Sequence, residues 1–107
     1  MPYSVAVTNQ HNGYHGGAIG SICDVAGGFA GLTVAPPGME VTTVEYKINF
    51  VSTAEPNGCL KVVGKVVKSG KRLIVSTAEV THVANETGKE SLCAIMQQTL
   101  IPVKKIY

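Results

Sequence analysis

The chain has 107 residues, which predicts one domain over residues 1–107. Its formal net charge of +2 and the lack of a dense basic run exclude a typical nucleic-acid-binding protein. The hydrophobic fraction is 45% and the mean hydropathy is +0.20, both high for so small a chain. We therefore expect part of its surface to be buried against another copy.

The three cysteines, Cys23, Cys59 and Cys93, lie far apart in apolar surroundings. Without a CxxC motif, this pattern predicts free, buried thiols in a reducing compartment. The first residues show no signal-peptide pattern, and the longest apolar stretch, around residues 18–37, is interrupted by a charge and by glycines. We expect a cytoplasmic protein without a membrane span.

In chain order, residues 3–8 predict a short strand and residues 9–14 a polar loop. Residues 16–34 carry apolar side chains on nearly every helical face, which predicts a buried helix. The sequence Pro36-Pro37-Gly38 ends it.

A period of two follows the helix and predicts antiparallel strands. In residues 43–50 it places Thr43 on the polar face and the apolar residues on the other, namely Val44, Tyr46, Ile48 and Phe50. Further strands are predicted over residues 59–68, 72–84 and 91–103, joined by turns. A helix that is apolar all round needs cover, which a curved sheet wrapped around it provides. The predicted fold is therefore α+β, in the hotdog arrangement.

One charge, Asp24, stands in the otherwise uncharged run HGGAIGSICDVAGGFAG, residues 15–31. It lies nine positions after the first residue of His15-Gly16-Gly17, and Asn9 precedes that triplet. With the later stretches VEYKINF and SGKRL, these motifs resemble the hotdog-fold acyl-CoA thioesterases of the phenylacetic-acid-degradation type. The resemblance covers nearly the whole chain from Asn9 onward. Asn12 is the alternative for the family's asparagine, although spacing favours Asn9.

The resemblance implies hydrolysis of an acyl-CoA thioester, with Asp24 as general base or nucleophile. Burying an ionised carboxylate costs free energy unless a partner compensates it, so a carboxylate in this position indicates a partner or a catalytic role. Gly17, or alternatively Gly16, would supply an oxyanion amide, because the first amides of a helix are unpaired and carry its positive dipole end. Asn9 and Thr43 would position the reactants. His15 would orient the loop through a hydrogen bond.

Helix geometry predicts how these groups are shared between subunits. Asp24 lies seven residues after Gly17, about 10 Å along a helix. One side chain cannot span that distance, so both groups can act on one thioester only if they come from different subunits. We expect a homodimer with composite sites, and the resemblance suggests a dimer of dimers.

Two further features have competing interpretations. The face formed by Gly20, Asp24, Gly27 and Gly31 would admit a thin ligand or allow close helix–sheet packing. The basic cluster at the predicted turn around Ser69-Gly70 would contact coenzyme A phosphates or be an ordinary solvated turn; its members are Lys68, Lys71 and Arg72. No metal or redox cofactor is implied.

Two other functions are compatible with the sequence. Relative to the family pattern the N-terminal part is short, and a missing pocket wall would leave a non-catalytic acyl-CoA or small-ligand binding module. A hotdog dehydratase would pair a catalytic histidine with the helix acid, and His15 is the candidate for that role. The sequence does not name the acyl group.

Overall fold

The computed structural model describes residue 1, residues 14–53 and residues 57–105. Its elements are, in order, α1 (Gly16–Leu32), β1 (Met39–Phe50), β2 (Cys59–Ser69), β3 (Ile74–Val83) and β4 (Glu90–Lys104). The helix and the four later strands are therefore present as predicted, although β1 begins earlier. The strand predicted over residues 3–8 lies outside the described residues.

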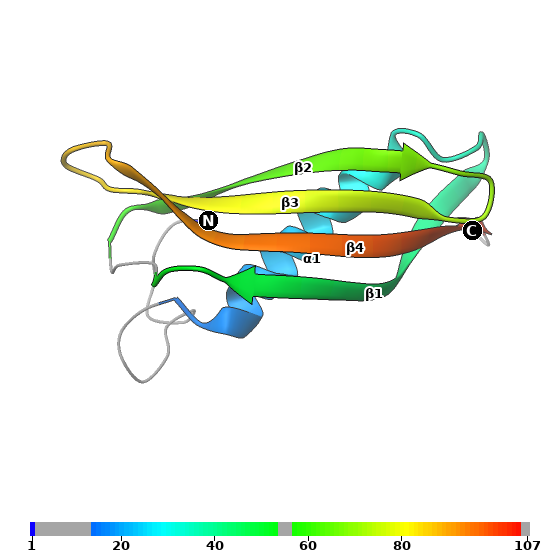
Figure 1. Cartoon of the computed structure of the whole chain (residues 1–107). Helices are drawn as coiled ribbons and strands as arrows, with labels where there is room; N and C mark the ends of the chain where they lie inside the picture. Colours follow the sequence, from blue (N-terminus) through cyan, green and yellow to red (C-terminus); the bar gives the residue numbers. More distant parts are fainter. Residues whose placement is uncertain (2–13, 54–56, 106–107) are drawn as a thin grey trace.

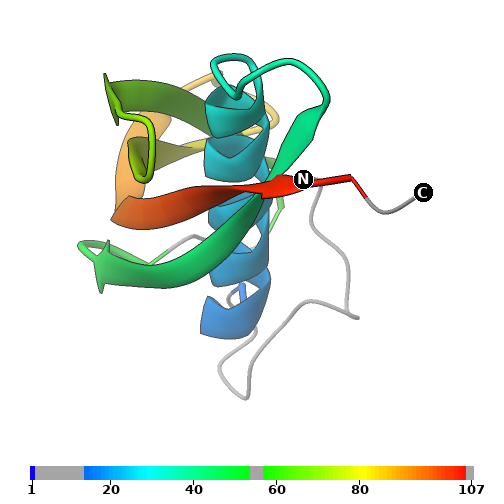
Figure 2. The same cartoon turned by 90° about the vertical axis from the view of Figure 1, so that its right-hand side faces the viewer.

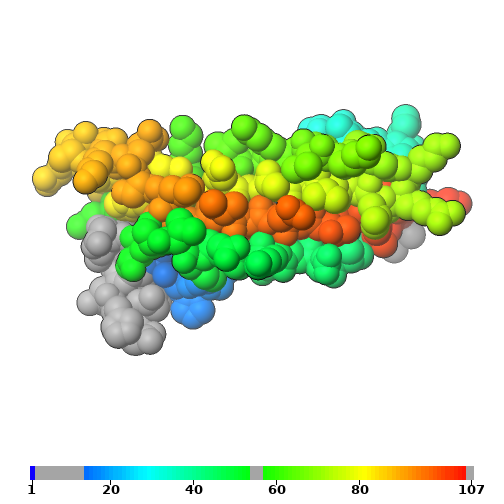
Figure 3. Space-filling view, viewed as in Figure 1, coloured from blue at the N-terminus to red at the C-terminus, as the bar shows by residue number. Residues whose placement is uncertain are grey.

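The four described strands form one antiparallel sheet in the order β1-β4-β3-β2. Helix α1 runs diagonally across one face of this sheet (Figure 1). The other face is a continuous surface of strand side chains, seen from the front in Figure 3. One helix against a four-stranded antiparallel sheet confirms the predicted α+β class.

The core lies between α1 and the sheet. Strand β3 shows the alternation most clearly, because every second side chain from Ile74 to His82 is buried. The buried hydrophobic cluster connects α1 with β2, β3 and β4. Its members are Tyr14, Ile19, Cys23, Leu60, Ala78, Val80, Cys93, Ala94 and Met96.

The sheet covers only one side of the helix. The buried residues of α1 include Ile19, Cys23 and Gly27, whereas Val25 and Phe29 on the other side are 56% and 66% exposed. In Figure 2 the strands are seen roughly end-on and α1 from the side, with the sheet curved along one flank of the helix. The predicted sheet wrapped around a long helix is therefore present, although its four described strands cover only one side of α1.

Helix α1 ends at Leu32, and the Thr33 hydroxyl donates to the Ala30 carbonyl. The backbone then turns at Pro36-Pro37-Gly38, where Gly38 has φ +80° and the Met39 amide donates to the Pro36 carbonyl at 3.1 Å. Proline followed by a residue with positive φ is typical of a type II turn. In the described part of the chain, no helix is long and apolar enough to cross a membrane.

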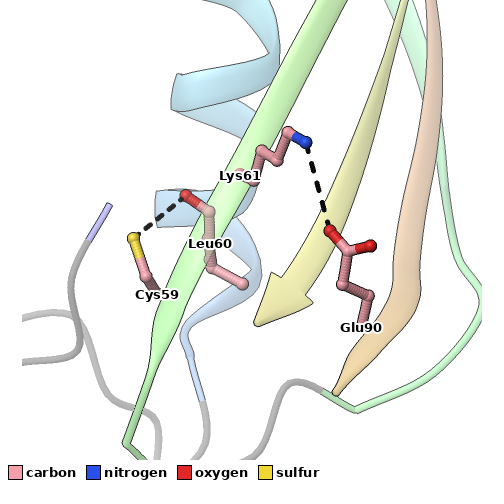
Figure 4. Close-up of polar contacts among 4 residues, drawn as sticks. All are labelled: Cys59, Leu60, Lys61 and Glu90. Carbon is pink, nitrogen blue, oxygen red and sulfur yellow. Dashed lines mark hydrogen bonds and ion pairs between the residues drawn. The ribbon is translucent and has the colours of Figure 1, made fainter. Parts of the chain in front are cut away.

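At the β2 edge, Cys59 is exposed, so the expectation of a buried thiol is wrong there. Cys23 and Cys93 are buried, and all three thiols are free. Figure 4 shows Cys59 with its sulfur 3.7 Å from the Leu60 carbonyl oxygen, and a nearby ion pair of 4.0 Å between Lys61 and Glu90. Both charged side chains are exposed, so this pair adds little stability.

Candidate active site

Asp24 lies near the middle of α1, half-buried and facing the sheet. Its Oδ1 accepts two hydrogen bonds, one from the Thr43 hydroxyl and one from the Gln98 side-chain amide, each 2.7 Å long. No described residue donates to Oδ2. The carboxylate is therefore held through one oxygen while the other remains available for chemistry.

A β-bulge gives Thr43 its place beside Asp24. The register of β1 against β4 shifts between Thr43 and Glu45, so Val44 is an extra residue. Thr43 consequently lies on the same face as Tyr46, which approaches the helix at Gly20. The predicted alternation, which placed Thr43 opposite Tyr46, is wrong at this position because the bulge changes which face the residue occupies.

Two buried polar residues complete the arrangement, and neither was singled out from the sequence. Gln98 on β4 and Ser76 on β3 are fully buried, and the Ser76 hydroxyl donates to Gln98 Oε1 at 2.9 Å. The Gln98 amide also donates to Thr43 Oγ1 at 3.2 Å. Both residues occupy inward positions of alternating strands, where apolar side chains are expected. Alternation alone does not mark them, because only the register of β3 and β4 shows that they lie on the inward face.

A shallow hollow of about 250 Å³ opens beside this network. It is bounded by α1 and β1 and lined by Asp24, Val25, Gly28, Phe29, Leu32, Glu40, Val41 and Thr43. Its wall is mainly apolar with the carboxylate and the Thr43 hydroxyl at one side, which suits an acyl chain next to a reactive carbonyl. A larger hollow of about 410 Å³ near the β3–β4 hairpin is lined by none of the predicted catalytic residues.

His15 caps the N-terminus of α1, and its Nδ1 accepts a hydrogen bond of 2.9 Å from the Gly17 amide. His15 therefore makes a hydrogen bond to the backbone two residues later, at the start of the helix. This bond occupies the Gly17 amide, whereas the Gly16 amide has no acceptor among the described residues. Of the two candidate oxyanion donors, Gly16 is therefore the one available in this arrangement.

Gly16 and Asp24 belong to one uninterrupted helix. They are eight residues apart, which is about 12 Å along the axis. Asp24 is also fixed toward the sheet by its two donors. Gly16 and Asp24 of the same chain are therefore too far apart to act on one thioester carbonyl, as the helix spacing predicts.

The glycine face of α1 serves close packing against the sheet. A Cβ at Gly27 would collide with Gln98, and one at Gly31 would collide with Leu100. Of the two interpretations, helix–sheet packing is therefore correct for these positions. The open side of the site is the hollow, where Gly28 has no neighbouring atom within 4 Å of an added Cβ.

The other predicted site residues are two asparagines and a basic cluster. Asn9 and the alternative Asn12 lie outside the described residues. Lys68, Lys71 and Arg72 are exposed around the β2–β3 turn, at the opposite end of the sheet from the start of α1 (Figure 1). Any contact between this turn and a ligand at Gly16 would need a second chain.

Cys23 is adjacent to Asp24 but has a different environment. Its side chain is fully buried, and burial raises the pKa of its thiol to about 11. It is therefore a neutral thiol near neutral pH and a poor nucleophile. Of these two adjacent residues, Asp24 is the candidate for chemistry.

The family model of the thioesterase superfamily matches residues 11–89. The chain therefore belongs to the thioesterase superfamily, and its α+β structure is the hotdog fold. A Saccharolobus solfataricus protein, provisionally named an esterase, is 35% identical over 94 residues, which is 86% of this chain and 64% of the relative. The chain thus spans slightly less than two thirds of that relative.

Solved structures show the same architecture. A thioesterase family protein from Silicibacter pomeroyi is 36% identical with a TM-score of 0.88, over 98% of this chain and 75% of the other. A Bacillus halodurans protein, solved with CoA, is 25% identical with a TM-score of 0.84, over 96% and 68% of the two chains. A hexameric broad-specificity acyl-coenzyme A thioesterase, 23% identical with a TM-score of 0.87 over 98% and 77%, shares the fold.

Proposed function

We propose that the protein is a cytoplasmic acyl-CoA thioesterase of the phenylacetic-acid-degradation type, with Asp24 at the centre of the reaction. The observation that carries this proposal is the Asp24 carboxylate, held at Oδ1 by Thr43 and Gln98 with Oδ2 free beside an apolar hollow. The superfamily membership and the relative solved with CoA support the reaction class and the substrate class.

In the general-base route, Oδ2 takes a proton from water as the water oxygen bonds to the thioester carbonyl carbon. The tetrahedral intermediate then breaks its C–S bond, and the departing thiolate receives the proton from Asp24. In the nucleophilic route, Oδ2 itself bonds to the carbonyl carbon, the C–S bond breaks, and the coenzyme A thiolate leaves and takes a proton from solvent. Water then hydrolyses the resulting anhydride to the carboxylic acid and the free Asp24 carboxylate. A single turnover in ¹⁸O-labelled water separates the routes, because only the second can place label in Asp24.

The Thr43 hydroxyl fits the role of orienting the attacking water. Its proton is directed to Asp24, and one of its lone pairs accepts from Gln98. Its remaining lone pair can accept from a water that is donating its other proton to Oδ2. Asn9 would act on the same water or on the thioester oxygen.

The developing oxyanion would be stabilised by the Gly16 amide at the positive end of the α1 dipole. We place this amide in a second copy of the chain, because it lies about 12 Å along the helix from Asp24 of its own chain. Two described surfaces suit such a partner: the exposed apolar side of α1 and the edge strand β1, which exposes Val44 and Phe50. The enzyme would then be a dimer or a dimer of dimers.

The basic cluster Lys68, Lys71 and Arg72 would meet the phosphates of coenzyme A from a neighbouring subunit. Its exposure and positive charge support this role. The acyl specificity would depend on how the hollow beside Phe29 is closed by the second chain.

The test of the proposed function is thiol release from short, long and aryl acyl-CoAs by the wild type and Asp24→Asn. We expect the substitution to lower kcat by at least about 1,000-fold, because both routes need a carboxylate. Unfolding temperature and oligomeric mass serve as controls for an intact fold. Tight acyl-CoA binding with no hydrolysis by the wild type would instead identify a binding module, and hydration of an enoyl-CoA would indicate a dehydratase.

A further inference from the structure

We propose that Gln98 is a positioning residue for Asp24. Ser76 holds Gln98 in place through a hydrogen bond, and Gly27 leaves the space that the Gln98 side chain occupies. This inference rests on the proposed thioesterase function. It concerns a buried chain of polar groups that runs from β3 through β4 to the helix. Its bond between Ser76 and Gln98 is buried, with the two residues 0% and 1% exposed, whereas the bonds that reach Asp24 and Thr43 are partly buried.

The direction of every hydrogen bond in this chain follows from Asp24. An ionised carboxylate only accepts, so Gln98 must present its NH₂ group to Oδ1. Gln98 Oε1 then faces Ser76, whose hydroxyl must donate. The second proton of the Gln98 amide goes to Thr43 Oγ1, which leaves the Thr43 hydroxyl proton for Asp24.

The result is a closed triangle of Asp24, Thr43 and Gln98 with one arrangement of protons. Because both donors end on Oδ1, the carboxylate cannot rotate without breaking two hydrogen bonds. Rotation is the motion that would turn Oδ2 away from the hollow. Gln98 therefore fixes which oxygen reacts and in which direction it points.

Gly27 provides the space that this arrangement needs. A Cβ at this position would overlap Gln98 Oε1 and would lie 3.0 Å from the Ser76 oxygen. Gly28, one residue later, has no atom within 4 Å of an added Cβ. Of these two adjacent glycines, only Gly27 is constrained by the polar chain.

The test compares Gln98→Met with Gln97→Met in the full-length protein, using the acyl-CoA that the wild type hydrolyses best. Methionine keeps the length and volume of glutamine but has no N–H donor. Gln97 lies next to Gln98 on the exposed face of β4, so its variant controls for the substitution itself. We expect Gln98→Met to lower kcat about 10- to 100-fold with KM within about twofold, and Gln97→Met to leave both unchanged.

The pH profile separates positioning from a structural effect. Loss of a donor to the carboxylate favours its protonated form, so the acid limb of kcat/KM should move to higher pH in Gln98→Met. The nearby titratable groups are Glu40 of β1, which lines the same hollow, Tyr46 of β1, which lies against Gly20, and Cys23, which precedes Asp24 on the helix. The inward His82 lies six residues along β3 from Ser76. None of these differs between the two methionine variants.

Two further variants secure the result if Gln98→Met does not fold. Ser76→Ala should lower kcat about threefold or more and shift the acid limb in the same direction, because the Gln98 amide loses its fixed orientation. Gly27→Ala should act similarly, because the added Cβ would displace the Gln98 side-chain oxygen. Folded variants with unchanged kcat and an unmoved acid limb would overturn the role of Gln98. A wild type without thioesterase activity would overturn the proposed function itself.

Discussion

Two adjacent side chains of α1 show how local surroundings decide chemistry. The Asp24 carboxylate accepts two hydrogen bonds and lines a hollow, so a ligand in the hollow can approach it. Cys23 is fully buried without a described hydrogen-bond partner, and burial raises the pKa of its thiol to about 11. The thiol is the stronger nucleophile when ionised, but burial keeps Cys23 neutral and out of reach of a substrate.

The Cys23 environment predicts a loss of stability at alkaline pH. Between pH 9 and 11 the unfolded chain releases the thiol proton while the folded chain retains it, so stability falls as pH rises. The effect is about 2–3 kcal/mol at most. Urea unfolding at pH 8 and pH 10.5 should show a smaller decrease for Cys23→Ala than for the wild type.

Cys59→Ala is the control for that measurement, because Cys59 is exposed. It should retain the pH dependence of the wild type even though it also removes one thiol. Equal decreases in all three proteins would show that Cys23 is not held neutral by the fold.

At the residue level, the sequence was sufficient to find Asp24, because it is a single charge in an apolar helix. It was not sufficient to find Gln98 and Ser76. Polar residues on strands usually lie on a solvent face, and only the register of β3 and β4 shows that these two point inward.

Among the elements, β1 shows what periodicity predicts and what it misses. The strand and its pairing type follow from alternation, and Ile48 does pack against the core as predicted. The bulge at Val44 leaves no signal in the pattern of apolar residues, since it adds one residue to an otherwise regular strand. This one residue nevertheless brings Thr43 to Asp24.

The start of α1 provides a test of the oxyanion donor. Gly16 is the first helical residue, a position where proline is well tolerated, and His15 before it has the extended backbone that proline favours. Gly16→Pro therefore removes one N–H with little change to the helix. We expect kcat to fall about 100- to 1,000-fold, measured by thiol release under saturating substrate.

Gly16→Ala is the matched control, because alanine adds a Cβ but keeps the amide. The added carbon would lie 3.3 Å from the Phe50 ring, which must move slightly. This variant should keep most of its kcat. Similar losses in both variants would assign the effect to crowding against Phe50 and not to the amide.

For the whole molecule, the sequence predicted a helix that needs cover on many sides, and the described sheet covers one of them. The uncovered side of α1 and the free edge of β1 border the hollow at Asp24, so the same surface would join two subunits and complete the site.

The most direct test of this account is complementation between two inactive chains. Asp24→Asn and Gly16→Pro, carrying different tags, are co-expressed and the mixed dimers are isolated. In a composite site, each mixed dimer has one intact site, formed by Asp24 of one chain and Gly16 of the other. Mixed dimers should therefore recover about half of the wild-type kcat per dimer. Mixed dimers as inactive as either parent would contradict a site shared between subunits.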